Sequence, residues 1–548
     1  MNTQSPVVFG LLSKAFASHQ TGRYVEARQL YQAVLQIDPR QVDALHLLGL
    51  LCSDAGDDES AVRWIGQALT LNPGFAAAHV NLGLALRRLG RHEEALETYD
   101  RAIAIAPDVV EAHFNRGNLL RDMGRTQDAF ESFLRVLQFQ PMYADALNNC
   151  GSILWKAEKY AEAITYFDRV LAIEPGHVDA QVNKASALEK LGQLDDALKI
   201  YDRILEVEPD HVPALVNRGV VLEEKGLIPL ALEHYLQAQK LSPGYADAHW
   251  NEALCRLKIG EYETGWEKYE WRWKEQRKNW IRDFKQPQWQ GESLDGRTIL
   301  LHAEQGFGDT LQFCRYARLV ADLGARVVLE VQGSLVKLLS SLEGVSQIVA
   351  KGAELPEFDL HCPLLSLPRL LRTRVDQIPD GSAYLSAPHE ILEKWQNLIP
   401  AVGRRRIGLI WATTTKGNKN LPISMLEKLI HEGNDYFCIQ KGVGDGDRTV
   451  LGRFSNLFLY DKELDDFADT AALVSCMDVI VSIDTSVAHL AGALGKPVWI
   501  MLPFAADWRW MIGRDDCPWY PTARLFRQPS PNDWIPVVDH ISAVLQGR

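Results

Sequence analysis

A carboxylate in a glycine-rich turn is the first residue of this sequence that could do chemistry. The stretch LHAEQGFGDTLQF, residues 301–313, runs from an apolar strand through Gly306 and Gly308 into a helix that contains Asp309. Such turns often bind phosphate, because the first amides of a helix have no partner within the helix. Asp309 stands where a phosphate would lie and would repel it. We therefore expect Asp309 either to cap its helix or to act as a general base.

Two later stretches have the residue types of an anion site. WATTTKGNKNLP, residues 411–422, brings hydroxyl groups and lysines to a strand end, and SIDTSVAHLAGALGKPVW, residues 482–499, joins a strand to a helix. The positive end of that helix and its hydroxyl groups favour an anion. A diphosphate held there would be a good leaving group, because donors aimed at the developing charge lower the barrier. The candidate donor-binding residues are Gly306, Gly308, Thr414, Thr415, Lys419, Asp484, Thr485, Ser486 and His489.

Structural alternatives remain open for these residues. His489 is either a core histidine bonded to a carbonyl or a residue that orients the phosphate loop. Lys419 is either a phosphate ligand or a solvated loop lysine. Asp484 either holds its turn or binds a sugar hydroxyl, and we do not expect it to act as an acid.

Two further stretches have a structural and a functional interpretation. Asp-Gly-Asp at residues 445–447 resembles the metal-binding acidic pair of the GT-A glycosyltransferase fold, but it also suits a turn, and we expect no metal. Trp508 and Trp510, in an aromatic-rich stretch, either stack on a sugar or base or cover the core.

In the first half of the chain, several residue types recur every 34 positions. Proline recurs at Pro39, Pro73, Pro107, Pro141, Pro175, Pro209 and Pro243. Glycine recurs at Gly22, Gly56, Gly90, Gly124, Gly192, Gly226 and Gly260, with Glu158 in the one gap. Alanine recurs at Ala27, Ala61, Ala95, Ala129, Ala163, Ala197 and Ala231. An aromatic column follows at Tyr31, Tyr99, Phe133, Phe167, Tyr201, Tyr235 and Tyr269, with Ile65 as the exception. The pattern predicts two helices per repeat, the glycine ending the first and the proline following the second.

At this period and pattern, residues 8–279 resemble tetratricopeptide repeats, with seven full repeats and a partial eighth. The resemblance implies an all-α solenoid with a concave surface that binds partners.

One polar column lies on the first helix of six repeats. Its members are Asn81, Asn115, Asn149, Asn183, Asn217 and Asn251. In one interpretation, each amide bonds the neighbouring helix and stiffens the stack. In the other, the amides form a ladder that holds an extended polypeptide by its backbone, because one side-chain amide can both donate to and accept from a peptide unit. The repeats of protein O-linked N-acetylglucosamine transferases look similar and use such a ladder to hold acceptor proteins. We favour the ladder.

The second half reads as two α/β lobes. After a linker at residues 280–296, strand-like and helical runs alternate through a first lobe, 297–400, and again through a second lobe, 404–548. This alternation predicts parallel sheets with helices on both faces. Ligands in such sheets bind beyond the carboxyl ends of the strands, so we expect the site in a cleft between the lobes.

The motifs GFGDTL and DTSVAHLAGALGKPV, in this order, resemble the ADP-heptose:lipopolysaccharide heptosyltransferase family. The resemblance covers roughly residues 297–548 and implies the GT-B fold of two Rossmann-like lobes, with Asp309 as the catalytic base. The family's phosphate loop aligns with Thr414, Thr415, Lys419 and Pro422, and its Asp-Thr/Ser-Gly-x-x-His motif with Asp484, Thr485, Ser486 and His489. Ser486 stands where the family has glycine, and a serine tolerates a tight turn less well.

Length and composition limit the functional classes. The chain of 548 residues is too long for one core, and its net charge of −13 argues against nucleic acid as the main partner. The eight cysteines form no CxxC pair, which favours a reducing compartment without a zinc cluster. We expect no signal peptide and no membrane span, and therefore a cytoplasmic protein.

These observations predict a glycosyltransferase that modifies proteins. We expect it to transfer a sugar from a nucleotide-sugar co-substrate to a Ser or Thr hydroxyl of a polypeptide held by the repeats, with inversion and without a metal or other cofactor. Flagellin or another surface protein would fit as the acceptor, by family analogy. The alternatives are a transferase with a carbohydrate or lipid acceptor, and a non-catalytic repeat scaffold.

Overall fold

The computed structural model describes residues 6–274, 282–379, 383–400, 403–413 and 419–547. The chain forms two compact units, Met1–Val207 and Glu208–Arg548. Thr414 and Thr415 lie outside the described residues.

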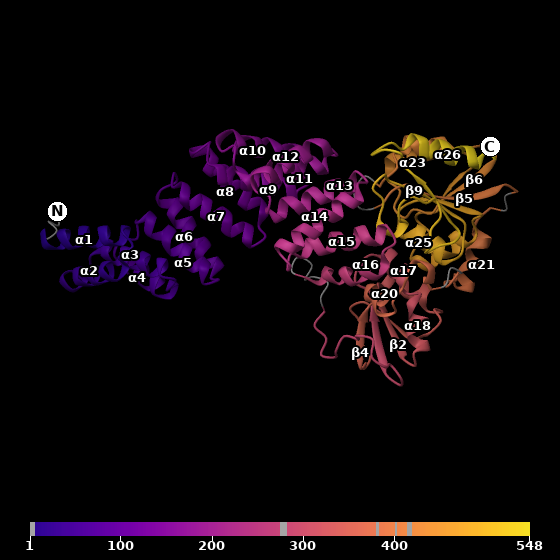
Figure 1. Ribbon diagram of the computed structural model, residues 1–548, viewed down its shortest axis with the longest axis horizontal. Coiled ribbons are helices and arrows are strands. Elements are labelled where there is room, and N and C mark those ends of the chain that lie inside the picture. The colour runs from indigo at the N-terminus through magenta and orange to yellow at the C-terminus, as the bar shows by residue number, and fades with distance from the viewer. Residues whose placement is uncertain (1–5, 275–281, 380–382, 401–402, 414–418, 548) are drawn as a thin grey trace. The chain divides into compact units, whose positions relative to one another are not determined.

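The first unit is entirely helical where it is described, and its helices follow one another as antiparallel pairs (Figure 1). They are α1 (Pro6–Gln20), α2 (Tyr24–Ile37), α3 (Val42–Asp54), α4 (Asp58–Leu71), α5 (Ala76–Arg88), α6 (His92–Ile105), α7 (Val110–Asp122), α8 (Thr126–Phe139), α9 (Ala144–Lys156), α10 (Tyr160–Ile173), α11 (Val178–Lys190) and α12 (Leu194–Val207). Each predicted repeat is one such pair.

The periodic columns have the structural roles that the sequence predicts. All seven alanines are fully buried, and so are the aromatic residues up to Tyr235 and the exceptional Ile65, while Tyr269 is 2% exposed. All seven glycines after the first helices have a positive φ, between 74° and 88°. This is the left-handed conformation that ends a helix at lowest cost with glycine.

Glu158 occupies the same position with a φ of 61°, where an L-residue other than glycine is strained. We expect Glu158→Gly to stabilise the first unit by about 1 kcal/mol, because it removes this strain. A higher urea midpoint would show the gain. Glu158→Ala keeps a β-carbon and is the control; an equal gain from alanine would show that the backbone conformation is not the cause.

The second unit begins with the last repeat helices. They are α13 (Val212–Glu224), α14 (Ile228–Leu241), α15 (Ala246–Lys258) and α16 (Tyr262–Tyr269), followed by the 3-10 turn η1 (Glu270–Trp273). The repeats thus continue within the unit that contains the sheets.

The first lobe contains a four-stranded parallel sheet of order β3-β2-β1-β4. The strands are β1 (Thr298–His302), β2 (Arg326–Val331), β3 (Val345–Ala350) and β4 (Leu360–Pro363). The helices and 3-10 turns are α17 (Phe307–Phe313), α18 (Tyr316–Asp322), η3 (Gly333–Leu335), α19 (Val336–Leu339), η4 (Leu364–Ser366), α20 (Leu367–Leu370), η5 (Val375–Gln377) and α21 (His389–Leu398).

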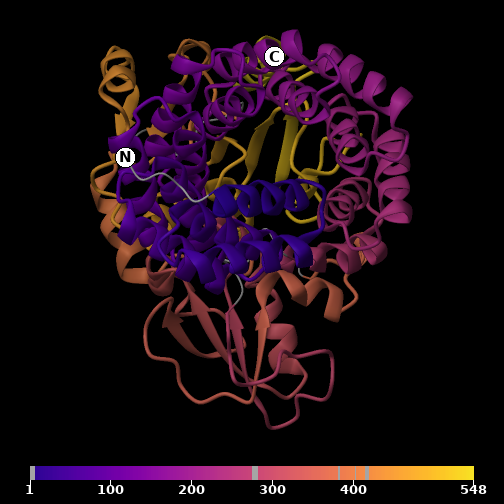
Figure 2. The ribbon, with the colours of Figure 1, turned by 90° about the vertical axis from the view of Figure 1, so that its left-hand side faces the viewer.

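Among the described residues, helices cover one face of this sheet, where we predict cover on both. Leu300, Val328 and Val349 form the other face, and the residues described against it, Phe284, Leu355 and Phe358, come from segments without helix (Figure 2). The connection from β3 to β4 has no helix, which explains the difference. The predicted linker also contributes to the lobe, because Trp289 is 2% exposed and its backbone N–H donates to the His361 carbonyl.

The second lobe contains a six-stranded parallel sheet of order β10-β9-β8-β5-β6-β7. The strands are β5 (Arg405–Ile410), β6 (Asn434–Cys438), β7 (Leu457–Leu459), β8 (Val479–Ile483), β9 (Val498–Leu502) and β10 (Ala523–Arg527). The helices and 3-10 turns are α22 (Ile423–Leu426), η6 (Glu427–Leu429), α23 (Asp445–Leu451), α24 (Phe467–Ser475), α25 (Ser486–Ala493), η7 (Trp508–Trp510) and α26 (Ile535–Leu545). Here helices cover both faces, with α24 and α25 on one and α26 on the other.

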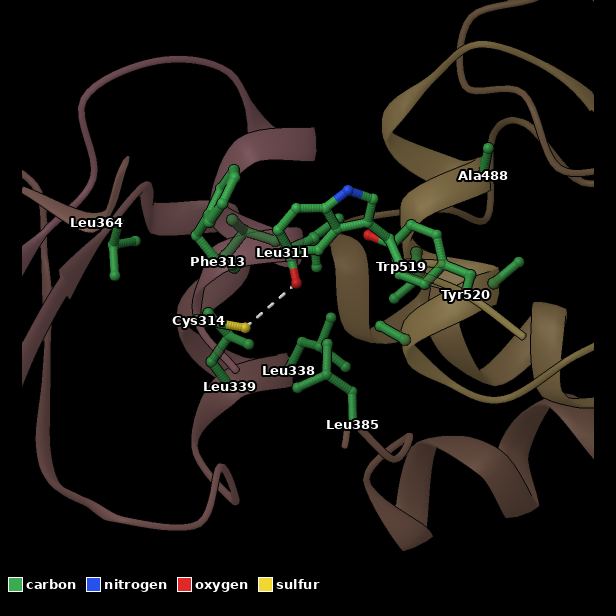
Figure 3. Close-up of a cluster of buried hydrophobic side chains, with 14 of the residues drawn as sticks. Leu311, Phe313, Cys314, Leu338, Leu339, Leu364, Leu385, Ala488, Trp519 and Tyr520 are labelled. Atoms are coloured by element: carbon green, nitrogen blue, oxygen red, sulfur yellow. Dashed lines mark hydrogen bonds between the residues drawn. The ribbon is translucent and has the colours of Figure 1, made fainter. Parts of the chain in front are cut away.

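The two lobes and the last repeat share one hydrophobic core. Trp519 and Tyr520 of the second lobe reach toward Leu311 and Phe313 on α17 (Figure 3). Trp266 of α16 packs edge-to-face against Phe313 with ring centroids 6.1 Å apart. The last repeat is therefore part of the core that positions α17.

Candidate functional site

Asp309 lies in the first turn of α17, and both of its carboxylate oxygens are engaged. Oδ2 accepts a hydrogen bond from the Gly306 backbone N–H at 2.9 Å, which caps the helix as one of our alternatives predicts. Oδ1 pairs with the guanidinium of Arg509. The side chain is 17% exposed. Burial raises the pKa of Asp309 above its ordinary value, and Arg509 offsets part of the effect. A raised pKa suits a general base, so the cap does not exclude the chemistry.

Arg509 comes from η7 of the second lobe and is fixed by several contacts. Its Nε donates to Gln312 Oε1 and its Nη1 to Asp507 Oδ1, each at 2.9 Å. The guanidinium carbon lies 4.4 Å from the ring centroid of Trp508. Burial opposes the charge of Arg509, but Asp507 and Asp309 outweigh it and raise its pKa. A fixed positive charge from one lobe therefore meets the carboxylate of the other.

The start of α25 lies on the second-lobe side of this cluster. Thr485 caps the helix, its Oγ1 accepting from the Ala488 N–H at 3.4 Å. Ser486 is the first helical residue and has no positive φ, so serine costs no backbone strain where the resembling family has glycine. The first amides of a helix have no acceptor within it, which leaves them for an anion.

Lys419 and Asp484, both predicted site residues, form an ion pair with Nζ 2.6 Å from Oδ2. The Lys419 side chain is 47% exposed and that of Asp484 is 8% exposed. Partial burial lowers the pKa of Lys419, but Asp484 and Asp507 outweigh it and the net direction is upward. The lysine is thus held as a cation beside the start of α25.

His489 is buried where α17 and α25 pack together. Its Nδ1 lies 3.0 Å from the Tyr520 hydroxyl, and its ring stacks on Trp510 at 5.1 Å. A β-carbon added to Gly308 would lie 2.9 Å from His489 Cδ2, so glycine allows this close approach. Burial lowers the pKa of His489 to about 4. His489 is a neutral, packed histidine between the two helix starts, and its described bond is to a hydroxyl, whereas the core alternative named a carbonyl.

The low pKa of His489 predicts a loss of stability in acid. Below about pH 6.5 the unfolded chain binds a proton that folded His489 does not accept until about pH 4. The free energy of unfolding should therefore fall in this range, by up to about 1.4 kcal/mol per pH unit. Urea unfolding at pH 7, 6 and 5 should show a smaller loss of unfolding free energy for His489→Gln than for the wild type. His389→Gln, at an exposed position, should behave as wild type. Equal losses in all three proteins would contradict the prediction.

Two other stretches have structural roles. Asp-Gly-Asp at 445–447 forms the first turn of α23, so the turn that we considered for it is wrong. Asp447 Oδ2 accepts from the Trp411 indole N–H at 2.8 Å, so this acidic residue holds a strand end. Trp508 is 3% exposed and Trp510 is fully buried, which confirms the interpretation that they cover the core. Gly306 offers no free amide to a phosphate, because its N–H donates to Asp309 Oδ2.

The asparagine column lies on first helices in both units, and all six side chains are partly exposed. In the first unit, three of them bond the preceding first helix: Asn81 to His46 at 2.9 Å, Asn149 to Asn118 at 3.3 Å and Asn183 to Asn148 at 3.2 Å. Among the described contacts, no side-chain hydrogen bond involves Asn115 in this unit, or Asn217 and Asn251 in the second. The amides thus stiffen the stack at three positions, and the peptide ladder stays a prediction.

Sequence reasoning missed the residues around Asp309. Asp507, Arg509 and Gln312 were not among the candidates, although they contact Asp309 or its partner. The stretch that contains Arg509 stood out for its tryptophans, and nothing in the spacing connected it to a turn 200 residues earlier. None of the described helices is long and apolar enough to cross a bilayer.

Comparisons with known proteins identify the repeats. Tetratricopeptide repeat models match residues 44–77, 74–142, 114–178 and 154–217. Protein FlbA of Caulobacter vibrioides is 24% identical over 324 residues, which cover 54% of each chain. The chain thus spans about half the length of the curated relative that it matches.

Several solved structures are similar to part of this chain. The MamA crystal structure is 25% identical, covers 29% of this chain and 94% of its own, and has a TM-score of 0.28. YrrB, described as a TPR protein with an unusual peptide-binding site, is 25% identical, covers 34% and 95%, and has a TM-score of 0.31. A tetratricopeptide repeat protein from Parabacteroides merdae is 17% identical, covers 46% and 99%, and has a TM-score of 0.36. By the models that match it, this chain contains tetratricopeptide repeats.

Proposed function

We propose that the chain is a GT-B glycosyltransferase that transfers a sugar from a nucleotide-sugar to a Ser or Thr hydroxyl of a polypeptide. One observation carries the proposal: Asp309 of the first lobe pairs with Arg509 of the second lobe, beside the start of α25 and the Lys419–Asp484 ion pair. Arg509 bridges the lobes, the Asp484 carboxylate raises the pKa of Asp309 by repulsion, and Asp507 raises the pKa of Lys419 by attraction. Asp309, the proposed base, thus faces the start of α25, which has Lys419 beside it.

In this proposal the reaction is a direct displacement at the anomeric carbon. The acceptor oxygen forms a bond to that carbon as the bond to the phosphate oxygen breaks, and the configuration inverts. The acceptor proton passes to Asp309, whose raised pKa suits this task. The free amides at the start of α25 and the ammonium of Lys419 stabilise the charge on the leaving diphosphate.

The repeats supply the acceptor in this proposal. Within each unit the partly exposed asparagines lie on successive first helices, the arrangement from which a repeat solenoid builds a binding surface. Asn115, which has no side-chain hydrogen bond among the described contacts, is the position in the first unit where an amide is left for a peptide backbone.

Donor binding is tested by thermal unfolding with a panel of nucleoside-diphosphate sugars. A ligand at 100 times its Kd stabilises the folded protein by about 2.7 kcal/mol, so one member of the panel should raise the Tm. Lys419→Met should weaken that ligand by about ten- to a hundredfold, because it removes a charged hydrogen bond. Lys428→Met, at an exposed position of η6, is the matched control. An affinity unchanged by Lys419→Met would contradict the proposed donor site.

A non-catalytic scaffold is the second candidate, and one observation favours it. Asp309 and Lys419 each have an internal ion-pair partner, as charged residues with a purely structural role would. A scaffold of this kind would neither hydrolyse a nucleotide-sugar nor transfer its sugar. The proposed enzyme would consume its donor.

A further inference from the structure

Arg509 contacts two residues on the same face of α17. Its Nη2 pairs with Asp309 Oδ1 and its Nε donates to Gln312 Oε1, one helical turn further on. A planar guanidinium can make both contacts at once, because its N–H groups form a rigid fork. The contacts therefore fix both the distance and the direction of the Asp309 carboxylate.

Arg509 is itself fixed from the other side. Asp507 Oδ1 accepts from both the Nη1 and the backbone N–H of Arg509, at 2.9 and 3.0 Å. The guanidinium lies over Trp508, and the Arg509 side chain is only 10% exposed. Trp508 in turn packs against Trp266 of the last repeat, with ring centroids 5.2 Å apart. These contacts hold the Arg509 side chain in one position, unlike that of a mobile arginine on the surface.

We propose that Arg509 is a positioning residue for Asp309, which holds the carboxylate ionised and aims it at the acceptor hydroxyl. The inference rests on the proposed function, in which Asp309 is the general base. Arg509 needs no contact with the substrate for this role, because it acts through Asp309.

The charges around Asp309 show why such a residue is needed. From the second lobe, Asp507 and Asp484 face it and favour the protonated carboxyl. Buried His489 packs against Gly308 as a neutral ring, and Tyr269 of α16 also interacts electrostatically with the pair. Burial acts in the same direction as the two acids, and Arg509 is the strongest opposing charge. Without Arg509 the pKa of Asp309 would rise further, and less of the carboxyl would be free to accept a proton from the substrate.

The test measures the Asp309 carboxyl directly by ¹³C NMR in the full-length protein, with its signal assigned by loss in Asp309→Asn. Arg509→Met should raise the pKa of Asp309 by about one to three pH units, as expected for loss of an adjacent opposite charge. Arg509→Lys keeps a positive charge and should cause a smaller rise. Arg514→Met removes an arginine of the same loop that pairs with Asp516, and it should leave the Asp309 titration unchanged. If Arg509→Met does not fold, Arg509→Gln replaces it with the same expectation.

The titration needs no substrate, so its failure is separable from failure of the proposed function. With an active donor, Arg509→Met should also move the lower limb of the kcat profile to higher pH, and Arg509→Lys should restore most of the wild-type profile. A carboxyl titration that is the same in Arg509→Met, Arg509→Gln and wild type would overturn the inference, even in an enzyme that transfers sugar.

Discussion

Asp309→Asn is expected to lower the rate of sugar transfer by about 10²–10⁴-fold, because the amide cannot accept the acceptor proton. Asparagine still offers an oxygen to the Gly306 N–H, so the helix cap and the fold should survive. Affinity for the nucleotide-sugar should change little, since the carboxylate acts on the acceptor. The measurement is kcat with saturating donor, together with donor affinity by calorimetry.

Asp466→Asn provides a matched control for this prediction. Asp466 also caps a helix, accepting from the Ala468 and Asp469 N–H groups at the start of α24, but it is not among the site residues. Its replacement should leave kcat unchanged. If Asp309→Asn turned over donor at the wild-type rate, the base would have to be another residue and the proposed mechanism would be wrong.

Arg272→Met is expected to lower the free energy of unfolding of the second unit by about 3–5 kcal/mol. Arg272 in η1 and Glu304 after β1 form a bidentate pair at 2.9 and 3.2 Å, and both side chains are fully buried. Removal of the arginine would leave the buried Glu304 charge with the Leu365 N–H as a donor but without a cationic partner, which is what makes such a change costly. Urea unfolding followed by tryptophan fluorescence measures the loss.

The double variant Arg272→Met with Glu304→Leu should recover much of that stability, because it also removes the fully buried Glu304 charge, whereas Glu270, the other carboxylate paired with Arg272, is 21% exposed. Arg318→Met is the surface control: its pair with Glu343 is more than half exposed on both sides and should contribute less than about 1 kcal/mol. A loss of the same size from Arg272→Met and Arg318→Met would show that the last repeat does not stabilise the first lobe. A much larger loss from Arg272→Met, as we expect, would show that the last repeat is an integral part of the first lobe.

The repeats could be predicted in detail because their information is local and repeated. The buried alanine and aromatic columns and the left-handed glycines follow from one 34-residue unit, and even Glu158 keeps the conformation of its column. The first three strands of the first lobe and the strands from β5 to β9 also agree with the apolar runs. β4 and β10, which the sequence did not identify, both lie at sheet edges.

The site was predictable only in part. Asp309, Lys419 and Asp484 follow from motifs, and the structure brings them into one charged cluster. Arg509 and Arg272 could not be found in this way. Their importance comes from contacts with Asp309 and Glu304, which lie 200 and 32 residues away along the chain. A lone arginine in an aromatic stretch has no pattern that distinguishes such a contact from a surface charge.

The most direct test of the account follows a radiolabelled sugar. The donor identified by the Tm panel is incubated with the full chain and an extract of the source organism from which the gene has been deleted. The account predicts label on a polypeptide that protease degrades and alkaline β-elimination releases, and no label with Asp309→Asn. Label confined to lipid or glycan, or transfer that Asp309→Asn leaves intact, would contradict it.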